Sequence, residues 1–125
     1  MLYNTDAQTI AAGGTLTLPA NSINSTGSII ASGTTGVTLT AGQYLVTFAS
    51  DASVTAAGTV GAALALDGTA LTYAETAQTL TAAGSDHIAL TAIISPTAGQ
   101  ILTVRNNTGN SVTYSNSTLT IVKLA

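Results

Sequence analysis

Hydrolytic chemistry is the first possibility that the residue types raise, because a serine, an acid and a histidine stand together at Ser85, Asp86 and His87. His87 is the one histidine of the chain. A catalytic triad needs a base, an orienting acid and an exposed nucleophile that converge in space. Three consecutive residues at the start of a strand do not supply that geometry. We therefore interpret the cluster as structural and expect no enzymatic activity.

Metal binding and glycosylation are the other site chemistries that the residue types allow. Five carboxylates and one histidine are scattered without the spacing of a ligand set, so we expect no metal and no other cofactor. Three segments match the N-glycosylation sequon: Asn24-Ser25-Thr26, Asn106-Asn107-Thr108 and Asn116-Ser117-Thr118. Chance matches are expected in a chain so rich in asparagine and threonine, so we assign no modification.

The low charge of the chain is its most unusual compositional feature. Charged residues make up 6% of the 125 residues, against about 25% in an ordinary soluble domain, and the hydrophobic share is 46%. A small monomer has too much surface to cover with so few charges, so we expect some of it to be buried in an oligomer. The length fits one domain, residues 1–125, and the absence of cysteine leaves the redox compartment open.

The distribution of charge also excludes some partners. The charged residues are scattered singly and sum to −3, with only two basic residues, so no basic patch can neutralise phosphates. We therefore do not expect nucleic acid or anionic membrane surfaces as partners. No run approaches the roughly 18 apolar residues of a membrane span, so membrane insertion is not expected either.

Short alternating runs separated by Gly, Asn, Ser and Asp recur along the chain, whereas no segment keeps the apolar spacing of a helix. Threonine with valine, isoleucine and leucine favours the half-buried surface of strands. The pattern predicts an all-β sandwich or barrel whose last strand is anchored by pairing on both sides. The expected strands cover residues 8–10, 15–18, 28–31, 37–40, 43–50, 59–66, 69–73, 78–81, 87–94, 99–105 and 118–124, with residues 51–58 as a flexible connection.

Two of these strands carry side chains that indicate close contacts. In strand 59–66, one face presents only the small residues Gly61, Ala63 and Ala65, which allow another backbone to approach. Either a neighbouring strand or a second subunit would satisfy that face. Strand 87–94 has little polarity on either face, which an oligomer requires but a monomeric sandwich does not.

A family resemblance appears in the strong strand Gly42-Gln43-Tyr44-Leu45-Val46-Thr47-Phe48. It resembles the Gly-x-Tyr-x-Val-x-Phe signature of the jelly rolls related to complement globular heads and tumour necrosis factor. Segments 65–69, 98–104 and 117–122 follow in the order expected of such a domain. Within the family, the chain is most similar to the C-terminal heads of collagen-like spore-surface (exosporium) glycoproteins of the BclA type.

The resemblance implies an antiparallel ten-strand jelly roll that trimerises about a threefold axis at the end of a collagen-like stalk. Such a domain acts as a trimerisation nucleus and an exposed adhesive head, outside the cell and on the spore exosporium. Its partners would be two further copies of itself and a surface receptor or glycan. Two departures stand out: these residues contain no Gly-X-Y repeat, and aromatic residues make up only 4%, so the subunit contact would be aliphatic and threonine-rich.

The resemblance also implies which side chains face the neighbouring subunits. It places Leu90, Leu119 and Ile121 inside the sandwich. It turns four residues outward, toward the trimer interface: Ala89, Thr91, Val122 and Leu124. Alternation alone separates these two sets but does not say which set is the core.

A second function is compatible with the same fold. The receptor-binding tip of a phage tail fibre can carry this jelly roll. The segment upstream of residue 1 distinguishes the two: Gly-X-Y triplets beside a spore-targeting segment favour the surface glycoprotein, and a baseplate-attachment region favours the fibre.

Overall fold

The computed structural model describes residues 2–18, 20–21, 29–32 and 34–125. These residues form eleven strands, one more than the resemblance implies: β1 (Leu2–Asn4), β2 (Gln8–Ile10), β3 (Ala20–Asn21), β4 (Ile29–Ser32), β5 (Gly36–Leu39), β6 (Tyr44–Val54), β7 (Gly58–Leu66), β8 (Thr69–Leu80), β9 (Gly84–Ile94), β10 (Gln100–Arg105) and β11 (Val112–Lys123). Within the described residues, no helix has the length and apolarity needed to cross a membrane.

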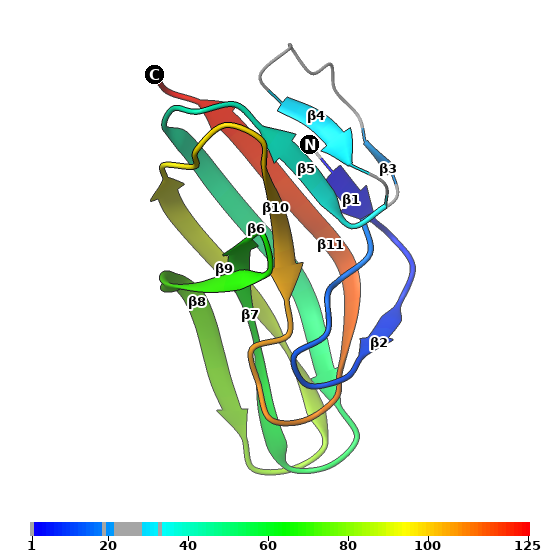
Figure 1. Ribbon diagram of the computed structural model, residues 1–125. Helices are drawn as coiled ribbons and strands as arrows, with labels where there is room; N and C mark the ends of the chain where they lie inside the picture. The colour runs from blue at the N-terminus through cyan, green and yellow to red at the C-terminus, as the bar shows by residue number, and fades with distance from the viewer. Residues whose placement is uncertain (1, 19, 22–28, 33) are drawn as a thin grey trace.

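The strands form two antiparallel sheets that pack face to face (Figure 1). Sheet A has the order β3-β1-β11-β6-β9, with β2 also paired to β11, and sheet B has the order β4-β5-β10-β7-β8. From β5 onward the chain passes repeatedly between the sheets, because β6, β9 and β11 belong to sheet A while β7, β8 and β10 belong to sheet B. This is jelly-roll topology, and it confirms the predicted all-β fold class.

The core lies between the sheets and follows the period-two pattern of the strands. On β6, Tyr44, Val46 and Phe48 are fully buried, because alternate side chains of a strand point to the same face. Leu119 on β11 is also fully buried and stands between Phe48 of β6 and Leu2 of β1 in the sheet. The alternation therefore predicted correctly which residues share a face.

The last strand is held on both sides, as predicted. β11 pairs with β6 along its length, and β1 and β2 pair with its other edge. Beyond β11, the amide of Leu124 donates to the carbonyl oxygen of Gln43 at 2.7 Å, and the amide of Gln43 donates to the carbonyl oxygen of Ala125 at 3.1 Å. The main chain of the final residues is therefore hydrogen-bonded rather than frayed.

Several of the predicted strand boundaries are wrong. β6 continues through Asp51 to Val54, where a flexible connection was expected, because Ala52 and Val54 keep the inward alternation of the strand. β8 is one strand where two were expected. Residues 15–18 are not a strand: only Thr15 makes an isolated bridge, to Arg105, although Leu16 and Leu18 are buried in the core.

The small residues of β7 contact the protein's own chain. Ala63 and Ala65 are fully buried within this single subunit. At Gly61, an added Cβ would collide with the carbonyl oxygen of Thr76 on β8 and with the side-chain amide of Asn107. Of the two possibilities that the sequence leaves open, contacts within the subunit account for this face, from the neighbouring strand β8 and from the loop between β10 and β11.

Tyr114 ties the two sheets together. Its ring is fully buried, and its hydroxyl on β11 of sheet A donates to the carbonyl oxygen of Gly61 on β7 of sheet B. Burial raises the pKa of the Tyr114 phenol above its ordinary value, because the phenolate would lose its hydration. The neutral hydroxyl therefore forms part of the folded structure.

Alkaline pH should weaken this fold through Tyr114. Since the folded state raises the pKa of the phenol, its contribution to stability is complete below about pH 10, the ordinary value, and declines as pH rises above it. Tyr114→Phe should cost about 1–2 kcal/mol at neutral pH and reduce the alkaline loss, as measured by urea unfolding between pH 8 and 11. Tyr73→Phe removes an exposed hydroxyl and serves as the control. Equal alkaline slopes in Tyr114→Phe and wild type would contradict the assignment.

Candidate interface on the outer face of sheet A

The side of sheet A that turns away from sheet B is its outer face, and the strand register arranges it in rows. At the end near the C-terminus, Leu45 of β6 lies directly opposite Ile93 of β9 and Val122 of β11. We call these three residues the apolar row. Ile93 is 56% exposed and Val122 is 48% exposed. Directly opposed side chains on one sheet face are in contact range, so the row is a continuous apolar strip open to solvent.

The next two rows are small and uncharged. The threonine row consists of Thr91, Thr47 and Thr120, and the alanine row consists of Ala89, Ala49 and Thr118. The hydroxyls of Thr47 and Thr91 are 3.5 Å apart. The side chains of these two rows are short on β9, β6 and β11, and the alanine row ends at Tyr3 of β1, which lies directly opposite Thr118.

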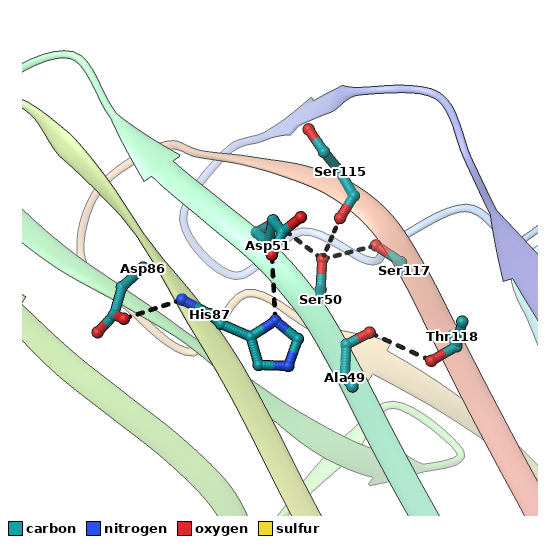
Figure 2. Close-up of polar contacts among 8 residues, drawn as sticks. All are labelled: Ala49, Ser50, Asp51, Asp86, His87, Ser115, Ser117 and Thr118. Atoms are coloured by element: carbon teal, nitrogen blue, oxygen red, sulfur yellow. Dashed lines mark hydrogen bonds and ion pairs between the residues drawn. The ribbon is translucent and has the colours of Figure 1, made fainter.

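The fourth row is polar, and we call it the polar row: His87 of β9, Asp51 of β6 and Ser115 of β11. His87 Nδ1 lies 3.1 Å from Asp51 Oδ1, and the two side chains are 64% and 56% exposed. Figure 2 shows the imidazole reaching across from β9 to the carboxylate on β6. The pKa of the Asp51 carboxyl lies below its ordinary value, chiefly because of the hydrogen bond from His87; desolvation opposes this shift, and a hydrogen bond from Asn116 adds to it.

A β-bulge next to the polar row determines which residues of β11 face outward. The pairing of β11 with β6 shifts between Ser115 and Thr118, and Asn116 has a left-handed φ of 53°. On the inner face, the fully buried Ser50 hydroxyl lies 2.9 Å from the Ser117 hydroxyl and 3.1 Å from the carbonyl oxygen of Ser115 (Figure 2). Ser50 therefore satisfies a carbonyl at the irregular point of the ladder, as a buried polar group must.

The structure does not assemble a catalytic triad at the Ser85, Asp86 and His87 cluster. Asp86 Oδ1 accepts a hydrogen bond from the backbone amide of His87 at 2.9 Å, so this acid does not orient the imidazole. Asp51 contacts the ring instead. An open hollow of about 500 Å³ adjoins the pair, and no serine hydroxyl in the described residues is hydrogen-bonded to the His87 ring. The geometry lacks the link between nucleophile and base.

Metal binding and glycosylation are the other two chemistries that the sequence allows. Among the described residues, no three His, Cys, Asp or Glu side chains form a group that could hold a metal. Asn106 is fully buried, and its side-chain amide donates to the carbonyl oxygens of Ile10 and Asn110, so this sequon is inaccessible in the folded protein. Asn116 is exposed at the bulge. Asn24 lies outside the described residues.

Of the four residues named for the trimer interface, Ala89, Thr91 and Val122 lie on the outer side of sheet A, as the resemblance implies. Val122 belongs to the apolar row, Thr91 to the threonine row and Ala89 to the alanine row, while Leu124, 49% exposed, follows just past β11. Sequence reasoning missed Leu45 and Ile93 as their neighbours. Alternation puts each of them on the face of its strand that does not carry the core residues. Only the strand register shows that they lie beside Val122.

Asp51 was missed because it was assigned to a connection. A signal for the bulge was present, since apolar residues occupy even positions at Val112 and Tyr114 and odd positions at Leu119 and Ile121. A change of phase within one strand indicates an inserted residue.

Comparison with solved structures shows which known folds the chain is similar to. No protein-family model matches the chain, and no curated protein matches it either. Among solved structures, Eiger TNF from S. frugiperda matches with a TM-score of 0.75 at 16% identity, over 98% of this chain and 90% of that one. The globular domain of zebrafish complement 1qA protein matches with a TM-score of 0.63 at 11% identity, over 94% and 92%.

These likenesses define the class of fold: the chain is a jelly roll of the type found in tumour necrosis factor and in the complement C1q globular head. The resemblance seen in the Gly42-to-Phe48 strand is therefore confirmed at the level of the fold.

Proposed function

We propose that residues 1–125 form one non-enzymatic head domain that assembles as a homotrimer through the outer face of sheet A. In this proposal the domain is the trimerisation nucleus and exposed adhesive head of a collagen-like glycoprotein on a spore or cell surface. The observation that carries the proposal is the apolar row, an exposed strip formed by Ile93, Leu45 and Val122 on the outer face of sheet A. The fold, and the resemblance to spore-surface glycoproteins, support the rest.

A second copy of the chain is the occupant that suits this face. Its apolar, threonine and alanine rows carry no charge, so an equally uncharged surface can cover them without leaving a buried ion unpaired. Other copies of a chain with only 6% charged residues supply such a surface. A standard contact takes about 800 Å² from each partner, a modest part of the 5788 Å² that one subunit exposes.

The proposed interface residues are those that the sequence named together with their neighbours in the sheet. The proposed interface keeps Ala89, Thr91, Val122 and Leu124. It adds Leu45 and Ile93. The contact is held by apolar burial and by close approach at the threonine and alanine rows, in place of large aromatic anchors.

Two measurements test the proposal, one on the unfused chain and one on a fusion. Light scattering at micromolar concentration should give about three times the 12.3 kDa mass of one chain. Fusing a short Gly-X-Y peptide before residue 1 should then give a collagen triple helix with a higher melting temperature by circular dichroism than the free peptide, because the trimer aligns three strands. The same fusion carrying Val122→Glu is the matched control. A stable monomer of the unfused chain would refute the assembly, and a trimer that leaves the peptide's melting temperature unchanged would refute the role as nucleus.

A further inference from the structure

The polar row lies on the same face as the apolar row, and this placement has a chemical consequence. Only the threonine and alanine rows separate the two. Strands in a sheet advance about 3.3 Å per residue, so successive rows are about 6–7 Å apart and the polar row lies about 20 Å from the apolar row. A subunit that covers the first three rows therefore brings its own surface up to His87 and Asp51.

We propose that assembly through this face is controlled by pH, because His87 takes up a proton when the polar rows of the subunits come together. This inference rests on the proposed homotrimer. It names a regulation of the same surface.

The charges around His87 give the direction of the effect. Asp51 of β6 faces the ring directly, at 3.1 Å. On β9 itself, the Asp86 carboxylate accepts a hydrogen bond from the backbone amide of His87. β11 contributes the uncharged Ser115 to the row. β8 also packs against β9, and its one carboxylate, Glu75, lines a separate hollow with Arg105 and Asn107.

No cation other than protonated His87 lies in the polar row. When the imidazole is neutral, each subunit brings an unbalanced Asp51 carboxylate into the assembly, and like charges brought together repel. When the imidazole is protonated, each subunit brings a neutral ion pair. Histidine is the side chain whose charge changes most readily at physiological pH, and protonation of His87 changes the net charge of each polar row from −1 to 0.

The sign of the linkage follows from proton counting. In this proposal the assembled state binds more protons than the separated subunits, so assembly is strengthened as pH falls and weakened as pH rises.

The test measures dissociation of the full chain in urea by sedimentation velocity, at one protein concentration, at pH 5.5 and 7.5. The wild type should need a higher urea concentration to dissociate at pH 5.5 than at pH 7.5. His87→Gln keeps a polar side chain but cannot ionise, so the difference between the two pH values should disappear. Asp86→Asn removes the acid that does not contact the ring and should retain the difference.

Asp51→Asn gives the sharpest result. Protonation would then create three unpaired cations, so this variant should dissociate more easily at pH 5.5 than at pH 7.5, the reverse of the wild type. A wild-type trimer with the same midpoint at both pH values, or a pH difference that persists in His87→Gln, would overturn the inference and leave the proposed trimer intact. A monomer at both pH values would refute the proposed function itself, and the inference with it.

Discussion

Val122→Glu is expected to convert the proposed trimer into a folded monomer. Val122 is 48% exposed in the single subunit and pairs with Leu45 in the apolar row, so a carboxylate there remains solvated when the subunit is alone. In the assembly it would be desolvated without a partner, at a cost of several kcal/mol for each of three copies. Light scattering should give the 12.3 kDa mass at micromolar concentration, with the far-UV spectrum and thermal transition of a folded protein.

Ile30→Glu is the matched control for this substitution. Ile30 is also an exposed aliphatic residue, 53% exposed, but it lies on β4 at the edge of sheet B. The same change of chemistry there should leave the trimer intact. If Val122→Glu stays trimeric while Ile30→Glu becomes monomeric, the subunit contact lies on sheet B and the outer face of sheet A is the wrong surface.

Leu119→Glu, three residues earlier on the same strand, should unfold the subunit. Leu119 is fully buried between Leu2 and Phe48, and no buried residue in the described part of the chain carries a positive charge. An isolated charge there costs several kcal/mol against a total stability of about 5–15 kcal/mol for a typical domain. Urea unfolding followed by circular dichroism should show loss of the cooperative transition at neutral pH.

Two milder substitutions on β11 serve as comparisons for Leu119→Glu. Leu119→Met conserves volume and should cost less than about 1.5 kcal/mol. Ile121 is only partly buried against the core, so Ile121→Glu should destabilise the subunit less than Leu119→Glu. A cooperative, near-native transition in Leu119→Glu would show that the inner face of β11 has been assigned incorrectly.

The strand alternation could be predicted from the sequence, and with it the division of each strand into two faces. Tyr44, Val46 and Phe48 share the buried face of β6 because successive side chains of a strand point in opposite directions, whatever the neighbours are. The scarcity of charge likewise belongs to the sequence, and it limits the partners before any fold is known. These properties are local or compositional, so no tertiary contact is needed to define them.

The tertiary structure decided which residues become neighbours across strands. Asp51 and His87 are 36 positions apart in the chain, and only the register between β6 and β9 brings them to 3.1 Å. The apolar row depends in the same way on two registers at once, one on each side of Leu45. A register is set by how whole strands pack into the sandwich and by irregularities such as the bulge at Asn116. For this reason the sequence predicted the faces of the strands, while the rows on those faces required the fold.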